Sequence, residues 1–223
     1  MLQPLALTFR LASVVAAILF FLALPIAYWI AFTRRPWKFL VEAVVALPLI
    51  LPPTVLGFYL LVALGPNSPF GRWFQSWSGH ALAFTFEGLV VGSVIYSLPF
   101  AVQPMAASFS AVDRHLLAAS ATLGASRWRT FLRIILPLSV PGLITAVTLS
   151  FAHTIGEFGV VLMIGGNIPG ATQTISIAIY DQVQALDYVA ANQAALVLLI
   201  ISFVLLSLVY GFNRRVWAVW PFK

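Results

Sequence analysis

The sequence contains no cysteine and very few charged residues. Only 8% of its 223 residues are Asp, Glu, Lys or Arg, against about 25% in an average soluble domain. Without cysteine there can be no disulfide, thiolate metal site or cysteine nucleophile. So few charges cannot keep a globular surface soluble, and 18 Phe and 7 Trp argue against intrinsic disorder. The remaining class is an integral membrane protein. With the helical spans expected below, we predict an all-α integral membrane protein with one transmembrane domain over residues 1–223.

Catalytic signatures are also missing. The sequence has no Walker loop, GxSxG nucleophile motif, HExxH motif or EF-hand loop. Its three histidines, His80, His115 and His153, lie far apart along the chain. We therefore expect a chain that is not an enzyme, has no metal site and binds no cofactor itself.

Five apolar segments are long enough to cross a membrane, which takes about 20 helical residues. The expected spans are residues 9–33, 40–64, 86–109, 137–164 and 188–213, with a cytoplasmic loop over residues 110–136. A cleaved signal peptide is the alternative for the first segment. Its apolar run is longer than the roughly 7–15 residues of a signal-peptide core, so we favour a span.

Basic residues gather on one side of these spans. Ten of the 12 Lys and Arg residues lie on the side of the 110–136 loop, and only Arg10 and Arg72 lie on the other. Cytoplasmic loops are rich in Lys and Arg, so the N-terminus is expected outside and the C-terminus in the cytoplasm. The net charge of +6 fits contact with anionic membrane lipid, without nucleic acid. Tryptophans near the span ends fit interfacial anchors: Trp29, Trp37, Trp73, Trp77, Trp217 and Trp220.

The 110–136 loop carries the most specific pattern. Ser110 and Asp113 predict a capping box that starts a first short helix. Gly124 predicts a left-handed end to that helix, and Ser126 can cap a second one. The second helix is expected to have one apolar face, formed by Trp128, Phe131, Leu132 and Ile135. An amphipathic connector lying on the lipid surface is the alternative.

From Ala119 onward this loop resembles the EAA loop of ABC importer permeases. Ala119, Gly124, Ile134 and the pair Leu136-Pro137 follow the spacing of that loop. The sequence departs from it at Ala118, where the pattern has Glu, and at Ser120, where it has Ala. The resemblance implies a type I ABC importer permease fold with five transmembrane helices and a cytoplasmic coupling helix. The residues implied to couple to an ATPase are Ala118, Ala119, Ser120, Leu123, Gly124, Ala125, Arg127 and Trp128.

Two further segments resemble the oxyanion permeases of that family. They are residues 47–71 and the GEFG motif of residues 156–159 with the following residues 165–175. The loop and residues 66–71 are most similar to the molybdate members, with sulfate or tungstate members as the alternative. The resemblance implies a bacterial inner membrane location and several partners: a second permease subunit in a homodimer, two cytoplasmic ATPases holding ATP and Mg, and an extracytoplasmic molybdate-binding protein. An ion-coupled secondary transporter is a more distant alternative.

Polar residues inside the fourth span are candidates for the translocation path. Thr145, Thr148, Gly156 and Glu157 are expected to line it, with ordinary helix packing as the alternative. His153 and Glu157 are four residues apart, so they share one face of a continuous helix and are expected to form an intramembrane pair. That pair could orient the span or act as a gate.

Two proline-containing segments carry the remaining expectations. Pro48, Pro52 and Pro53 predict a bend in the second span, because proline removes backbone donors. After the fourth span, an extracytoplasmic loop is expected to dock the binding protein, and an ordinary turn is the alternative. Its candidate docking residues are Asn167, Pro169 and Gly170.

Overall fold

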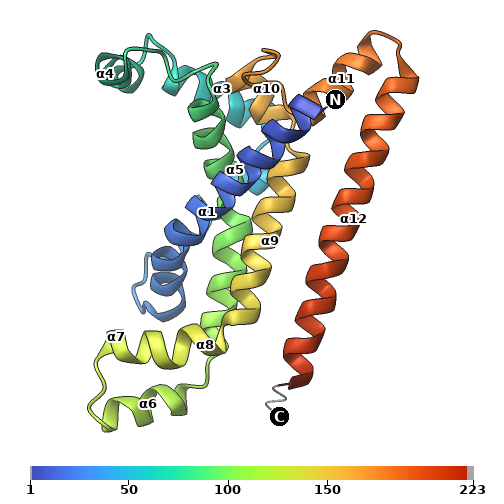
Figure 1. Cartoon of the computed structure of the whole chain (residues 1–223). Coiled ribbons are helices and arrows are strands. Elements are labelled where there is room, and N and C mark those ends of the chain that lie inside the picture. The colour runs from blue at the N-terminus through green and yellow to red at the C-terminus, as the bar shows by residue number, and fades with distance from the viewer. Residues whose placement is uncertain (1, 220–223) are drawn as a thin grey trace.

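The computed structural model describes residues 2–219, except for the side chains of residues 209 and 212–219. All regular structure in that part of the chain is helical (Figure 1). The elements are, in order, α1 Leu2–Phe32, α2 Lys38–Ile50, α3 Pro53–Leu64, α4 Pro69–Ser78, α5 Phe86–Ser110, α6 Arg114–Thr122, α7 Arg127–Thr130, a π-helix Phe131–Ile135, α8 Leu136–Leu138, α9 Val140–Gly156, α10 Gly159–Gly165, α11 Ile175–Gln184 and α12 Tyr188–Val219. Lys223 and Trp220 lie outside the described residues, as do the side chains of Arg214, Arg215 and Trp217.

Three helices in the described chain are long and apolar enough to cross a membrane alone: α1, α5 and the Tyr188–Leu208 part of α12. Two bent pairs meet the same test together. They are α2 with α3, bent by 111°, and Arg127–Leu138 with α9, bent by 71°. If each bent pair is one span, the number of spans reaches five.

The bend expected in the second span is present. α2 ends at Ile50 and α3 begins at Pro53, with Pro52 in an extended conformation (φ −54°, ψ 135°). Two successive prolines remove two backbone donors, so the helical hydrogen-bond ladder cannot run through them. Pro48 lies inside α2 without ending it.

The fourth span is not the continuous helix over 137–164 that the sequence predicts. It bends before Val140, and α9 ends at Gly156 because Glu157 is extended (φ −69°, ψ 135°). A new helix, α10, starts at Gly159. Gly156 and Gly159 on either side lower helix propensity, which makes a break at Glu157 inexpensive.

The main core lies where α1, α5 and α9 meet. On α1, every fourth residue from Leu11 to Ala27 is fully buried, so one row of side chains packs against the other two helices. Met105 and Phe109 of α5 and Ala146 of α9 are equally inaccessible. A second, smaller core joins α3 to α10 and is formed by Leu64, Leu82, Val160 and Ile164.

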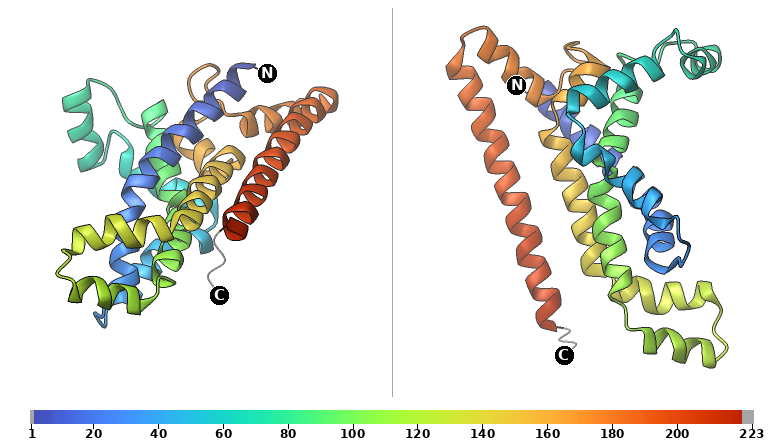
Figure 2. Two further views of the ribbon diagram at one scale, coloured as in Figure 1. Left: turned by 60° about the horizontal axis from the view of Figure 1, so that its bottom comes forward. Right: turned by 180° about the vertical axis from the view of Figure 1, so that it is seen from behind.

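The two ends of the molecule carry different segments (Figures 1 and 2). The N-terminus and α4 lie at one end, and the α6–α7 loop lies at the other, towards which the C-terminal part of α12 runs. α4 lies between the second and third expected spans and was not among the predicted elements. Its start is explained by Ser68, whose Oγ accepts a hydrogen bond from Gly71 N at 2.7 Å, and by Pro69 in the first turn. Trp73 and Trp77, two of the expected membrane anchors, project from α4 and are exposed.

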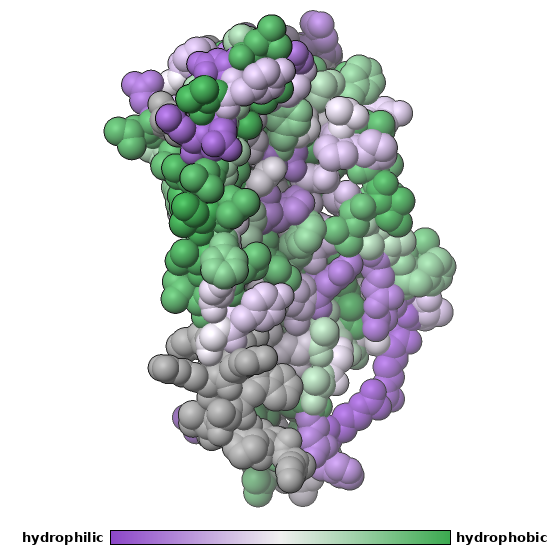
Figure 3. Space-filling view, turned by 90° about the vertical axis from the view of Figure 1, so that its right-hand side faces the viewer, coloured by the Kyte–Doolittle hydropathy of each residue, from purple (hydrophilic) through white to green (hydrophobic). Residues whose placement is uncertain are grey.

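α12 lies at the edge of the bundle, follows α11 and also contacts α9, where Ala191 and Ala194 are buried (Figures 1 and 2). Only 11% of its spanning segment is buried, against 50% for α5. Its exposed side chains include Leu199, Phe203 and Leu208. Hydrophobic residues cover the left of the middle of this side of the molecule, while hydrophilic ones gather at the top and at the lower right (Figure 3). Such a surface requires lipid or another membrane chain against it.

Candidate functional site

The loop between α5 and α9 folds into two short helices, α6 and α7, as the sequence predicts. Asp113 caps α6, because its Oδ1 accepts a hydrogen bond from His115 N at 2.8 Å. Ser110 does not take part, so the predicted capping box is wrong: α5 continues through Ser110. Ser126 caps α7 as predicted, with its Oγ accepting from Arg129 N at 3.2 Å.

Gly124 turns the chain between these helices. Its φ of +73° confirms the predicted left-handed conformation. No heavy atom lies within 4 Å of a Cβ built at this position. The requirement for glycine here is therefore conformational, not a matter of space.

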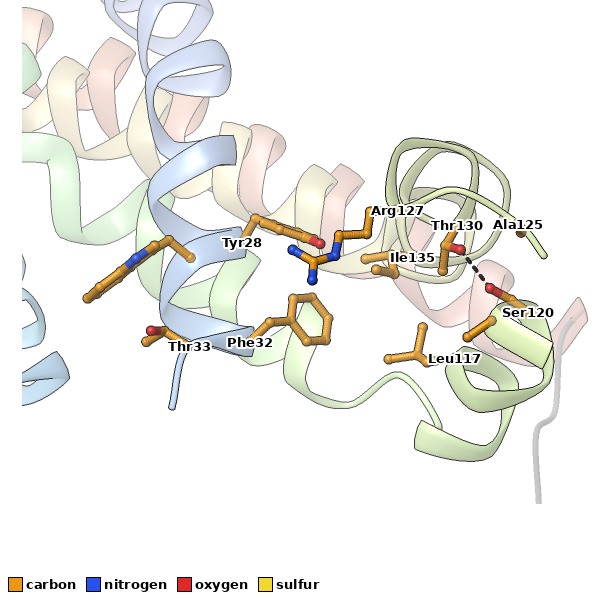
Figure 4. A pocket seen from close by; sticks show the side chains of 11 residues that line it. Tyr28, Phe32, Thr33, Leu117, Ser120, Ala125, Arg127, Thr130 and Ile135 are labelled. Carbon is orange, nitrogen blue, oxygen red and sulfur yellow. Dashed lines mark hydrogen bonds between the residues drawn. The ribbon is translucent and has the colours of Figure 1, made fainter. Parts of the chain in front are cut away.

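One hydrogen bond joins α6 to α7 across this turn. Ser120 Oγ and Thr130 Oγ1 are 2.6 Å apart (Figure 4), and Ser120 is only 7% exposed. Ser120 stands where the EAA pattern has alanine, which has no side-chain hydroxyl. This departure from the pattern therefore supplies a link between the two helices.

Most residues expected to contact an ATPase are exposed at this end of the molecule. Leu123 is 86% exposed and Trp128 is 67% exposed. Ala118, Ala119, Gly124 and Arg127 are also exposed, Ala125 is half-buried and Ser120 is buried. Apolar side chains of this size are poorly solvated, so the loop presents a surface suited to a partner.

A cavity of about 460 Å³ separates this loop from the end of α1. Tyr28, Phe32 and Thr33 line it from the α1 side, and Leu117, Ser120 and Arg127 line it from the loop. Arg127 reaches towards the rings of Tyr28 and Phe32 (Figure 4). The Arg127 side chain thus faces α1, which the sequence does not indicate.

Phe131 anchors the loop to the bundle. Its ring lies 5.4 Å from that of Tyr28 on α1 and 6.1 Å from that of Phe109 on α5, measured between centroids. The expected apolar face is unevenly buried: Ile135 is buried, whereas Trp128, which stacks on Phe131, and Leu132 are exposed. The helix widens to a π-helix from Phe131 to Ile135, which shifts later side chains around the axis.

The two helix breaks lie against each other inside the bundle. A Cβ added to Gly159 would lie 2.6 Å from Pro53 Cβ, and one added to Gly57 would lie 2.8 Å from Met163 Cβ. Real Cβ atoms do not approach so closely. Glycine at both positions therefore lets α3 and α10 make contact.

A second cavity, of about 560 Å³, lies beside these breaks. Its polar groups are the hydroxyls of Thr54 and Tyr96, the imidazole of His153 and the carboxylate of Glu157. The other lining residues are Pro53, Ala152, Gly156, Phe158, Gly159, Leu162 and Met163. The structure thus brings together three of the expected intramembrane residues, His153, Gly156 and Glu157.

Thr145 and Thr148 do not line this cavity. Their hydroxyls donate to carbonyls of their own helix, those of Pro141 and Ile144, each at 2.9 Å. Both residues lie nearer the loop end of α9 than His153 does. Their place in a translocation path stays a prediction.

The expected pair of His153 and Glu157 is not formed. His153 Nδ1 lies 2.9 Å from Ser97 Oγ, and Glu157 Oε1 accepts a hydrogen bond from Val160 N at 2.6 Å. Within the described residues, the ion pair found is between Lys38 and Glu42, at 3.3 Å. The prediction assumed a continuous helix, and the break at Glu157 takes its side chain off the α9 face.

Asn167, Pro169 and Gly170 lie in an exposed loop at the end of the molecule opposite α6 and α7 (Figure 1). Asn167 Nδ2 donates to Asp181 Oδ2 of α11 at 2.5 Å, and Gln173 Nε2 donates to Asn167 Oδ1 at 2.9 Å. Gly170 has a φ of +78°. The loop is therefore a hydrogen-bonded turn, and its role in docking stays a prediction.

Sequence reasoning missed Thr54, Tyr96 and Ser97 as members of the site. A signal for two of them was available. Ser93, Tyr96, Ser97 and Phe100 are three or four residues apart on α5, so polar and aromatic groups share one face of an otherwise apolar helix. Thr54 directly follows Pro53 at the start of α3 and has no comparable pattern.

Known proteins are similar in sequence to most of this chain. A family described as "Binding-protein-dependent transport system inner membrane component" matches residues 23–218. The "Molybdenum transport system permease protein ModB" of Azotobacter vinelandii is 50% identical over 213 residues, which cover 96% of this chain and 94% of that protein. The "Sulfate transport system permease protein CysT" of Escherichia coli (strain K12) is 35% identical over 187 residues, which cover 82% of this chain and 67% of that protein.

A solved structure has the same fold. It is that of "a bacterial ABC transporter involved in the import of the acidic polysaccharide alginate", with a TM-score of 0.76. The match covers 96% of this chain and 79% of that chain, at 18% identity. This likeness concerns the fold alone, and it confirms the expected all-helical permease fold of type I ABC importers.

Proposed function

Since the chain belongs to the family of binding-protein-dependent transport system inner membrane components, we propose that it is the permease subunit of an ATP-driven importer for molybdate. The cavity beside the two helix breaks is the observation that carries the transport part of this proposal. Irregular backbone at membrane depth is tolerated where it is buried in protein or lines a cavity. The higher identity to the molybdenum permease than to the sulfate permease supports the choice of oxyanion.

In this proposal the path runs between two copies of the chain. The cavity beside the breaks has few polar groups in one copy, and α12 leaves a large apolar surface uncovered. A homodimer would cover part of that surface and enclose the path at the shared interface. Gly156, Glu157 and His153 would line the path from each copy, with Thr145 and Thr148 nearer the cytoplasm.

The α6–α7 loop is the proposed contact with an ATPase that holds ATP and Mg. Its exposed Leu123 and Trp128 would enter a groove of that subunit, one ATPase below each permease. ATP-driven closure of the two ATPases would draw the two loops together. Phe131 would pass this movement to α1 and α5, because its ring packs on both helices.

The proposed orientation places this loop in the cytoplasm of a bacterial inner membrane and the N-terminus outside. The concentration of Lys and Arg on the loop side supports it. A molybdate-binding protein would then dock from outside on the turn that contains Asn167, Pro169 and Gly170. Since this turn is fixed to α11 by Asp181, docking could act on α11 and α12.

Uptake into proteoliposomes tests the proposal. The permease is purified with its ATPase and reconstituted with ATP inside, and the binding protein and molybdate are added outside. We expect molybdate inside the vesicles that depends on ATP and on the binding protein, and competition by tungstate more than by sulfate. Uptake that proceeds without ATP would contradict an ABC importer, and preferential sulfate uptake would correct the substrate.

A further inference from the structure

Polar groups beside the helix breaks form a chain of hydrogen bonds in which the donor of each bond can be assigned, and this chain ends at the cavity. We propose that this cavity is a transit site for the oxyanion, and that the anion is accompanied there by one proton, bound at Nε2 of His153. This inference rests on the proposed function, because it concerns the same transported anion. It adds a residue, a charge state and a pH dependence to that function.

The first observation is a chain of hydrogen bonds that leads away from the cavity. Thr154 Oγ1 donates to Ser150 O at 2.8 Å, which uses the one proton of that hydroxyl. Ser97 Oγ lies 3.1 Å from Thr154 Oγ1 and must therefore donate to it. The remaining contact, 2.9 Å between His153 Nδ1 and Ser97 Oγ, then needs a proton on Nδ1.

This assignment fixes the state of the other ring nitrogen. A neutral imidazole with its proton on Nδ1 has a lone pair on Nε2, so it can accept a hydrogen bond but cannot donate one. Nε2 has no hydrogen-bond partner among the described residues, and His153 lines the cavity. The neutral ring would therefore present a lone pair to an arriving oxyanion, which is repulsive.

Protonation of Nε2 removes this conflict without disturbing the chain. The imidazolium still donates from Nδ1 to Ser97, and it gains a second donor on Nε2. Aromatic neighbours fix the orientation of the His153 ring. It stacks on Phe100, with 4.0 Å between centroids and 26° between planes, and lies 4.8 Å from the ring of Tyr96.

The other groups of the cavity leave His153 as the source of positive charge. Among its lining residues, α5 contributes Tyr96 and the break after α9 contributes Glu157, while α3 and α10 contribute no titratable group. No Lys or Arg lines the cavity. Thr54 and Tyr96 can donate hydrogen bonds to an oxyanion, but Glu157 can only accept when ionised.

A dianion in such a cavity needs a compensating charge, because burying an unpaired charge is costly. An imidazolium without an anion has the same problem, so His153 is neutral in the empty cavity. The anion and the proton therefore stabilise each other. The proton comes from water on the side from which the cavity is entered, and no other bond is made or broken.

The test compares the pH dependence of uptake in wild type and in His153→Gln, in the reconstituted complex with its ATPase and binding protein. Each uptake rate is divided by the rate of ATP hydrolysis measured at the same pH without binding protein. This division corrects for the pH dependence of the ATPase itself. We expect wild-type uptake to fall by about fivefold or more from about pH 6 to about pH 8, as the imidazole loses its proton. His153→Gln should be slow at all of these pH values, with a flat profile.

Tyr96→Phe is the matched control, because it removes the other neutral titratable group of the cavity and keeps the ring. Its uptake should be slower than that of wild type, because one donor to the anion is lost, but it should fall by the same factor between these pH values. A fall of the same size in wild type and His153→Gln would overturn the inference and leave the importer standing. No molybdate uptake at any pH would overturn the proposed function instead.

A second measurement needs no variant and covers the case in which His153→Gln does not assemble. Molybdate is added to the purified permease–ATPase complex in weak buffer with a pH indicator, without the binding protein. We expect protons to be taken up from solution as the anion binds. Anion binding without proton uptake would overturn the inference.

Discussion

The α6–α7 loop and the cavity beside the helix breaks are stabilised over very different distances along the chain. The bond that joins α6 to α7 connects residues ten apart, and the caps of Asp113 and Ser126 act within three residues. In the cavity, Ser97 and His153 are 56 residues apart. The loop can therefore change its surface without changing the bundle, whereas the cavity cannot lose a contact without disturbing helix packing.

The largest effect is expected at Leu123, where a substitution should change ATPase binding without changing the stability of the bundle. In the proposed complex, Leu123→Asp replaces a buried apolar contact by a charge, which should weaken ATPase binding roughly thirtyfold, or about 2 kcal/mol. The measurement is the affinity of the detergent-solubilised permease for its ATPase. Thermal unfolding of the permease alone should be unchanged, because Leu123 is 86% exposed.

Leu123→Met is the control for that substitution, since it keeps an apolar side chain of similar volume and should keep the affinity. An unchanged affinity for Leu123→Asp would mean that this loop does not dock by its apolar surface.

The next largest effect is expected at the helix breaks, where adding one methyl group at Gly159 should lower the stability of the permease. In Gly159→Ala the new Cβ would lie 2.6 Å from Pro53 Cβ, and such overpacking costs about 1–3 kcal/mol. The matched variant is Gly156→Ala, where nothing lies within 4 Å. Thermal unfolding in detergent should show a lower midpoint for Gly159→Ala only. Equal midpoints would show that α3 and α10 are not in close contact.

A smaller effect is expected at Gly124. Gly124→Ala forces a Cβ into a φ of +73° and costs about 1 kcal/mol. Gly124→Asn should cost less, because asparagine tolerates this region better. ATP hydrolysis stimulated by the binding protein should be lower in the alanine variant than in the asparagine variant. The reverse order would indicate that the turn changes conformation when the ATPase docks.

The smallest effect is expected at Ser120. Ser120→Ala removes the hydrogen bond to Thr130, which contributes about 1 kcal/mol or less. Thr122→Ala is the control, because Thr122 Oγ1 bonds only to Ala118 O in its own exposed helix. Amide hydrogen exchange of α6 and α7 should be faster in Ser120→Ala. Equal exchange in both variants would show that the link does not hold the two helices together.

The features that sequence predicted well depend on near neighbours. The turn at Gly124 and the cap at Ser126 are encoded within a few residues, and both are confirmed. The prolines that bend the second span act on their own backbone. Even at this range one assignment failed: Ser110 and Asp113 can both cap a helix, and the packing of α5 decides between them.

The features that sequence missed depend on which side of each helix faces the bundle. The break at Glu157 is favoured by the contact of Gly159 with Pro53, from a helix far away in the sequence. The rotation of α5 relative to α9 determines which side chain forms a hydrogen bond with His153. No pattern of neighbouring residues in the sequence predicts that rotation. α4 differs from these features, because its start has a local signal, a serine followed by a proline.

The small core shared by α3 and α10 has a mechanical consequence. A break separates each of these helices from the helix before it, at Pro52 and at Glu157. Val160, Ile164 and Leu64 join the two short helices to each other. The two short helices therefore form one unit, and Ile164 also holds this unit to α5, because its side chain fills the space beside Gly88 and Gly92. A displacement of the unit would change the opening beside α9 only if α5 moved with it.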